Sequence, residues 1–73
     1  MRLRHIEVFH AVMQTGSVSA AARLTNVTQP AVSRTLQHAE LQLGFPLFER
    51  VRGRLTPTNE AMALFPLVER LYE

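Results

Sequence analysis

The sequence contains no cysteine, which limits both its covalent and its metal chemistry. Disulfide bonds are excluded, and so are the thiolate zinc sites that stabilise many small domains. No apolar run reaches the roughly 18 residues that a membrane-spanning helix needs. The basic and partly apolar start of the chain is interrupted by Glu7 and His10, which argues against a signal peptide. We therefore expect no membrane partner.

Lysine, aspartate and tryptophan are also absent. An enzyme needs convergent catalytic groups, and no Ser–His pair at a suitable spacing replaces the missing types. The histidines are His5, His10 and His38, and the first two are five residues apart, off a common helix face. No thiolate or carboxylate cluster joins them, so the sequence predicts no metal site, no cofactor in this domain and no enzymatic activity.

The charge of the chain is carried by arginine and glutamate alone, with a net charge of +2 over 73 residues. That length predicts one small domain. Residues 1–58 are cationic, whereas residues 59–73 contain Arg70 against Glu60, Glu69 and Glu73. This asymmetry indicates an anionic partner for the body of the chain and a different role for its tail.

The first half of the chain predicts three helices. Apolar residues at helical spacing, Leu3, Ile6, Phe9 and Met13, indicate a helix over residues 3–14 that ends at a glycine. A short second helix contains "AAARL", with Ser17 and Ser19 as alternative N-caps. Thr28 is the expected cap of a third helix over residues 28–43, whose buried stripe is Val32, Leu36, Ala39 and Leu43.

In the second half of the chain, the helical spacing of apolar residues first gives way to an alternating pattern. In "PLFERVRGRLTPT", arginines alternate with other residues around a glycine, which predicts a short β-hairpin. Thr56 followed by Pro57 is typical of a helix start, so we expect a fourth helix to follow, in which Pro66 either causes a kink or leaves one hydrogen bond unmade. Its apolar stripe could be intramolecular core or a dimer interface, and the residues in question are Ala61, Leu64, Phe65, Val68, Leu71 and Tyr72.

These elements predict a mostly α fold, a winged helix-turn-helix with a three-helix core and a short β-hairpin wing, followed by a fourth helix with a candidate dimer interface. The polar face of the third helix could be merely solvated. A helix start with compact side chains and hydrogen-bonding groups is also what the major groove of DNA accepts.

Four motifs, "SAAARL", "TQPAVSR", "AELQLG" and "PLFER", make the chain resemble the N-terminal domain of LysR-type transcriptional regulators. Two further stretches, "LRHIEVFHAVM" and "FERVRGRL", are especially similar to the founding member of that family. The resemblance implies that residues 1–57 are a DNA-binding domain and that residues 58–73 begin a dimerising linker helix. It implies sequence-specific binding of double-stranded DNA by the helix over residues 28–43 and by a wing over residues 49–55. The implied DNA-binding residues are Ser17, Ser19, Thr28, Gln29, Pro30, Ser33, Arg34, Gln37, Arg50, Arg52 and Arg54.

The resemblance also implies partners beyond DNA. It implies a homodimer through the linker helix on an inverted-repeat promoter site, a tetramer at full length, and RNA polymerase as a further candidate partner. A small-molecule effector is expected in a C-terminal domain that this chain does not contain, and the expected location is the cytoplasm, at the nucleoid. The alternative is a winged-helix module that binds protein and not DNA, which the arginines of the third helix and the wing disfavour.

Overall fold

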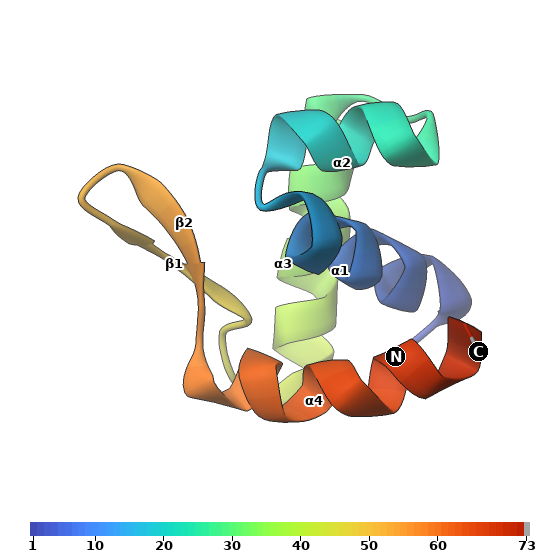
Figure 1. Ribbon diagram of the computed structural model, residues 1–73, viewed down its shortest axis with the longest axis vertical. Helices are drawn as coiled ribbons and strands as arrows, with labels where there is room; N and C mark the ends of the chain where they lie inside the picture. The colour runs from blue at the N-terminus through green and yellow to red at the C-terminus, as the bar shows by residue number, and fades with distance from the viewer. Residues whose placement is uncertain (73) are drawn as a thin grey trace.

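The computed structural model describes residues 1–72 and contains four α-helices and one β-hairpin (Figure 1). Glu73, the last residue of the predicted fourth helix, lies outside the described residues. The elements in chain order are α1 Leu3–Thr15, α2 Val18–Thr25, α3 Gln29–Leu43, β1 Phe48–Val51, β2 Arg54–Pro57, α4 Asn59–Glu69 and the short 3₁₀ helix η1 Arg70–Tyr72. The predicted winged helix-turn-helix fold is confirmed.

Three of the helices begin at a hydroxyl side chain that accepts a hydrogen bond from the first turn. Ser17 accepts from the Ala20 amide at 3.0 Å and Thr28 from the Ala31 amide at 3.3 Å. Ser17, not Ser19, is therefore the cap of α2. These caps satisfy amides that have no partner inside the helix, which is why helix starts are readable in a sequence.

The predicted start of the fourth helix was wrong by two residues. Thr56 and Pro57 belong to β2, where Thr56 pairs with Glu49 and Pro57 with Phe48. The cap is Thr58, whose buried hydroxyl accepts from the Ala61 amide at 3.1 Å and donates to the Pro46 carbonyl at 2.8 Å. Pairing with β1 and this buried hydrogen bond decide the boundary over the local Thr–Pro signal.

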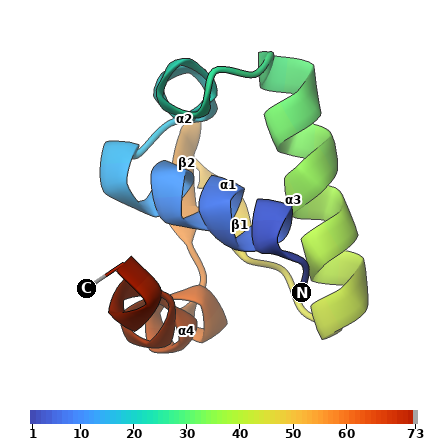
Figure 2. The same ribbon diagram turned by 90° about the vertical axis from the view of Figure 1, so that its right-hand side faces the viewer.

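The core lies where α1, α2 and α3 meet, and α4 closes it from below (Figures 1 and 2). The predicted stripe of α3 is confirmed at Val32, Leu36 and Ala39, which are all buried. In α1 the predicted stripe is confirmed at Phe9, which is fully buried, and Ile6 and Met13 pack half-buried against the core. Leu3, which is 70% exposed, departs from the prediction. The buried apolar residues are Val8, Phe9, Ala11, Val12, Ala21, Ala22, Val32, Leu36, Ala39, Leu47, Ala61 and Val68.

Pro66 lies inside α4, which continues to Glu69 and then tightens into η1. Among residues 1–72, no helix has the length and apolarity that crossing a membrane requires.

Candidate nucleic-acid interface

A tight turn sets α2 across the start of α3 (Figure 2). Asn26 adopts the left-handed conformation with φ of 61°, which asparagine tolerates better than most residues. The Val27 amide then donates to the Ala22 carbonyl at 3.0 Å and closes the helix end. The small side chains of Ala21 and Ala22 are buried, which lets α2 approach its neighbours closely. The geometry of the helix-turn-helix therefore depends on one left-handed turn residue, Asn26, and on the small buried side chains of two alanines.

The polar side of α3 faces solvent along its whole first half. Its first turn is compact. Pro30 has no N–H and the Ala31 amide donates to Thr28, so Gln29 has the amide of this turn that can meet an anion. The opposite side of the helix holds the buried stripe, so the polar side is presented in one direction. Every residue predicted on this side is exposed, namely Thr28, Gln29, Pro30, Ser33, Arg34 and Gln37.

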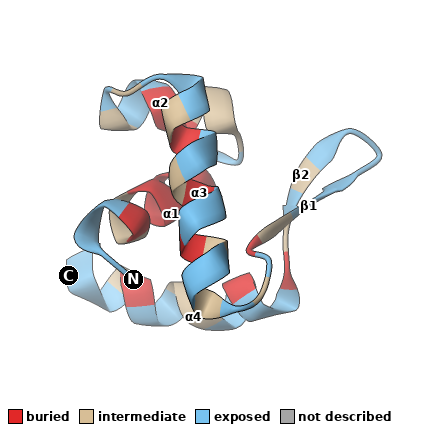
Figure 3. Ribbon diagram, turned by 180° about the vertical axis from the view of Figure 1, so that it is seen from behind, coloured by how far each residue is buried: buried red, intermediate tan, exposed pale blue. Residues whose placement is uncertain are grey.

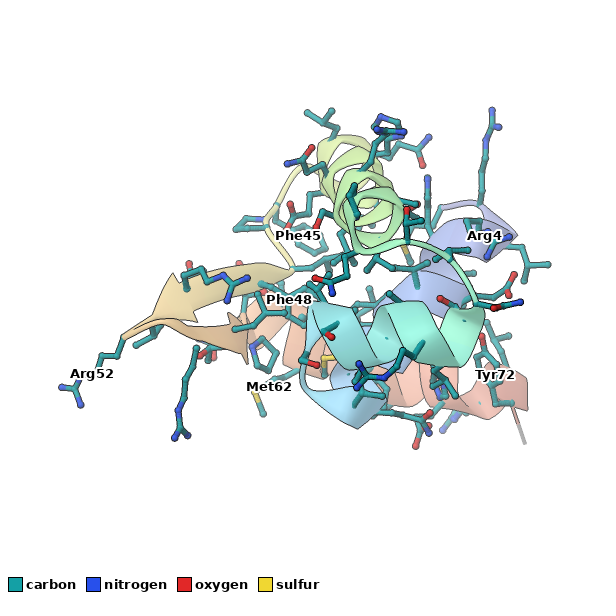
Figure 4. The ribbon with its side chains drawn as sticks, turned by 90° about the horizontal axis from the view of Figure 1, so that it is seen from above. Arg4, Phe45, Phe48, Arg52, Met62 and Tyr72 are labelled. Atoms are coloured by element: carbon teal, nitrogen blue, oxygen red, sulfur yellow. The ribbon has the colours of Figure 1, made fainter. Side chains whose placement is uncertain are left out.

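The wing is a two-stranded antiparallel hairpin in which Val51 pairs with Arg54 and Arg50 with Leu55. Its two-residue turn consists of Arg52 with φ of 53° and Gly53 with φ of 77°. Two positive φ angles define a type I′ turn, whose twist matches that of the strands. Arg52 projects from the tip into solvent (Figure 4). All three wing arginines are exposed, and the wing is exposed over most of its length (Figure 3).

A groove runs between the start of α2, the start of α3 and the wing, and we call it the wing groove. It consists of adjoining hollows that share Gln29. Two of the hollows also share Arg50, so the first turn of α3 and the wing face the same space. The predicted residues that line the wing groove are Ser17, Ser19, Thr28, Gln29, Pro30, Ser33, Arg50 and Arg54.

Three predicted residues do not line the wing groove. Arg34 and Gln37 lie further along the exposed side of α3, and Arg52 lies at the tip of the wing. Arg23 was not predicted, yet it lines the hollow that contains Thr28 and donates from Nη1 to the Ser19 hydroxyl at 3.2 Å. Its spacing of four residues from Ser19 on one helix was the signal that could have found it.

Glu40 links α3 to the wing. Its Oε2 accepts hydrogen bonds from the amides of Leu47, at 2.6 Å, and Phe48, at 3.4 Å. Leu47 is fully buried, so its amide needs this internal partner. Phe48 also lies against Phe9 of α1, with ring centroids 5.9 Å apart. The base of the wing is therefore attached to the same core that supports α3.

The predicted dimer stripe is divided between core and surface. Ala61 and Val68 are buried within this chain, and Leu64 and Phe65 are half-buried and packed against the core. Leu71 and Tyr72 are 65% and 50% exposed. Two exposed apolar residues of α4, Met62 and Leu67, lie outside the predicted set.

Both buried histidines have protein partners. The His5 Nδ1 accepts from the Arg2 amide at 3.3 Å, and His10 Nε2 lies 2.9 Å from Glu69 Oε2. Burial lowers the pKa of the His5 imidazole, and the nearby N-terminal amine, His38 and Arg2 lower it further. Within the described chain, no group of three histidine, aspartate or glutamate side chains is arranged to hold a metal ion.

The fold and the wing groove define a winged helix-turn-helix domain of the kind that binds nucleic acid. Residues 3–62 match the family described as "Bacterial regulatory helix-turn-helix protein, lysR family". The chain belongs to this family. It is a helix-turn-helix domain of the LysR family, and its relatives are transcriptional regulators.

Two curated relatives show the extent of the similarity. The regulator DgcR of Pseudoalteromonas sp is 62% identical over 73 residues, which are 100% of this chain and 25% of that protein. The transcriptional activator LysR of Escherichia coli K12 is 54% identical over 70 residues, or 96% of this chain and 22% of that protein. The predicted similarity to the founding member is thus real, although DgcR shares more residues. The chain spans about a quarter of the length of these relatives.

Solved structures agree with the fold and include DNA complexes. The crystal structure of the CbnR_DBD–DNA complex matches with a TM-score of 0.89 and 32% identity, covering 99% of this chain and 83% of that one. The BenM_DBD/benA site 1 DNA complex matches with a TM-score of 0.90 and 33% identity, covering 99% of this chain and 81% of that one.

Proposed function

We propose that this chain binds double-stranded DNA sequence-specifically, with α3 in the major groove and the wing beside it. The observation that carries the proposal is the wing groove, in which the start of α3 and two wing arginines, Arg50 and Arg54, face one space. Two structural relatives at 32% and 33% identity are DNA complexes, which supports the same partner for this chain.

The two parts of the interface have side chains suited to different contacts. Gln29, Ser33, Arg34 and Gln37 are exposed and can donate to or accept from base edges. At the start of α3 the amide of Gln29 can donate to a phosphate, since Pro30 has no N–H and the Ala31 amide donates to Thr28. The wing arginines suit backbone phosphates or a narrow minor groove, whose negative potential is enhanced.

Dimerisation through α4 is part of the proposal. The solvent-exposed apolar residues of α4 are Met62 and Leu67, and exposed Leu71 and Tyr72 follow in η1. Burial of Ala61 and Val68 within the chain makes them supports of these exposed residues rather than contacts with a second copy. A two-fold dimer would bind an inverted repeat, because half-site symmetry mirrors protein symmetry.

The whole protein is proposed to be a cytoplasmic, nucleoid-associated regulator. We assign residues 1–57 to DNA binding and residues 58–73 to the start of the linker helix. An effector-binding domain beyond this chain, a tetramer and contact with RNA polymerase belong to the same proposal.

A salt series of DNA binding by fluorescence anisotropy tests the function. One duplex carries an inverted repeat enriched from a random library, and the other is a scrambled version of the same composition. We expect selective binding of the repeat, with an affinity that falls steeply with salt because phosphate contacts release counterions. Failure to bind either duplex would favour the alternative, a module that binds protein.

A further inference from the structure

His10 lies where α1 meets the C-terminal end of α4 and the following η1, and it contacts three side chains from these two elements. Its Nε2 is 2.9 Å from Glu69 Oε2 in α4, and its ring stacks on Tyr72 of η1 with centroids 4.0 Å apart and planes 14° apart. The ring centroid of Phe65, also in α4, lies 5.7 Å from that of His10. Positions 65, 69 and 72 are spaced four and three residues apart, so one continuous helical face meets one imidazole.

The contact is enclosed on the side of α1 and open on the side of α4. The side chain of His10 is 10% exposed, whereas that of Glu69 is 46% exposed. Burial raises the pKa of Tyr72, and the negative charge of Glu7 raises it further, so the phenol stays neutral while it stacks on His10. His10 is thus held by the core and in turn holds the helix end.

The other end of α4 is attached independently. Thr58 caps the helix and donates from its buried hydroxyl to the Pro46 carbonyl at 2.8 Å, directly before the wing. A helix attached at both ends has a set direction relative to the body of the domain. Since α1 also packs against α3, the direction of α4 is related through α1 to the direction of α3.

We propose that His10 is a positioning residue that sets the direction of α4, and thereby the half-site spacing that the dimer accepts on DNA. The inference rests on the proposed function. In a two-fold dimer joined through α4, a change in the angle between α4 and the core moves the two α3 helices apart or together. Half-site spacing is a geometric consequence of that distance.

The test uses four variants of the 73-residue chain and a library of random duplexes. Glu69→Ala removes the hydrogen bond from a half-exposed position, and His10→Phe keeps a ring for stacking while it loses the hydrogen bond. Glu69→Gln keeps a hydrogen-bonding group at the same place. Glu60→Gln, an exposed carboxylate in the first turn of α4, is the matched control. Sequencing of the bound duplexes gives the half-site motif and the distribution of half-site distances.

We expect Glu69→Ala and His10→Phe to keep the half-site motif and to lose severalfold in preference for the best spacing over its neighbours. Glu69→Gln and the control should keep the wild-type distribution. A merely structural role would instead lower total binding without changing the distribution. If His10→Phe does not fold, as judged by circular dichroism, Glu69→Ala decides alone because it alters a half-exposed side chain.

Three results would overturn the inference and can be told apart. If folded Glu69→Ala and His10→Phe both keep the wild-type spacing, His10 does not set it, while the proposed function stands. If the wild-type chain selects a single half-site without any preferred spacing, the inference fails together with the dimer part of the proposed function, while DNA binding stands. If the wild-type chain enriches no motif at all, the proposed function fails and the inference fails with it.

Discussion

Helix α3 and the wing face the same groove, but the core supports them very differently. Helix α3 has Val32, Leu36 and Ala39 buried on its inner side. The wing has no fully buried residue in either strand, and Phe48 and Leu55 are only half-buried. Figure 3 shows this contrast as a helix with red turns beside a hairpin that is mostly pale blue.

The difference matches what each part of the interface has to do. Reading a base edge needs side chains held in register, because a good bidentate contact depends on geometry. Contact with a phosphate depends mainly on charge and tolerates adjustment of a long arginine side chain. A packed helix therefore suits base readout, and an exposed hairpin with three arginines suits the backbone. Four predictions test this contrast, in order of decreasing effect.

The largest effect should come from Phe9→Ala, which removes the support that helix and wing share. Phe9 is fully buried and lies 5.9 Å from Phe48 at the base of the wing, centroid to centroid. We expect a loss of about 3–5 kcal/mol in the free energy of unfolding. Urea denaturation followed by circular dichroism measures it, with Leu3→Ala as control because that side chain is 70% exposed on the same helix. Equal effects of the two variants would contradict the core that the structure assigns to α1.

Glu40→Ala should separate the wing from the helix while leaving the helix packed. It leaves the buried amide of Leu47 without its charged acceptor, which should cost about 1.5–3 kcal/mol of stability. Amide hydrogen exchange should increase at Leu47 and Phe48 more than at Val32. Glu40→Gln keeps an acceptor and should lose less. An equal increase in amide exchange at Leu47, Phe48 and Val32 would mean that Glu40 does not link the wing to α3.

Arg34→Ala tests base readout by the helix. We expect a loss of about 1–3 kcal/mol in specific binding, together with a blurred sequence preference. Competition of the selected duplex against single-base variants gives the preference. Arg70→Ala removes an exposed arginine in η1, away from the groove, and serves as control. A preference profile unchanged by Arg34→Ala would rule out readout by this side chain.

Arg52→Asn should have the smallest effect on DNA affinity, and this effect should depend least on the sequence of the DNA. Asparagine followed by glycine is favoured in type I′ turns, so the hairpin should persist without the charge. Selected and scrambled duplexes should weaken by similar factors, and the salt slope should fall by about 0.9 for each phosphate that the variant no longer neutralises. Arg52→Lys keeps the charge and should keep the slope. A weakening confined to the selected duplex would assign a base contact to the wing.

Local signals in the sequence predicted much of the helix-turn-helix. Ser17 and Thr28 are readable as caps because each satisfies an amide in its own first turn. The exposed side of α3 follows from the buried stripe on its opposite side, since both depend on one helical period. Arginines alternating around Gly53 predicted the hairpin for the same kind of reason, a period of two with a turn residue at the centre.

The start of α4 could not be predicted from the same kind of signal. Thr56–Pro57 and Thr58 offer competing local caps, and the choice is made by pairing with β1 and by the hydrogen bond from Thr58 to Pro46. Leu3, which is exposed, and Ala61, which is buried, show the same limit of local patterns. A helix can have apolar residues on two faces, and the element that packs against the helix decides which face is buried.

The sequence by itself determined the elements, the family and the polar residues of α3, because caps, periods and turn residues act over a few positions. Only the tertiary structure decided which residues share a space. Ser17 and Gln29 meet Arg50 in the wing groove, and His10 meets Glu69 across 59 positions of the chain. Contacts over such distances depend on how whole helices pack against a common core, which no local pattern records.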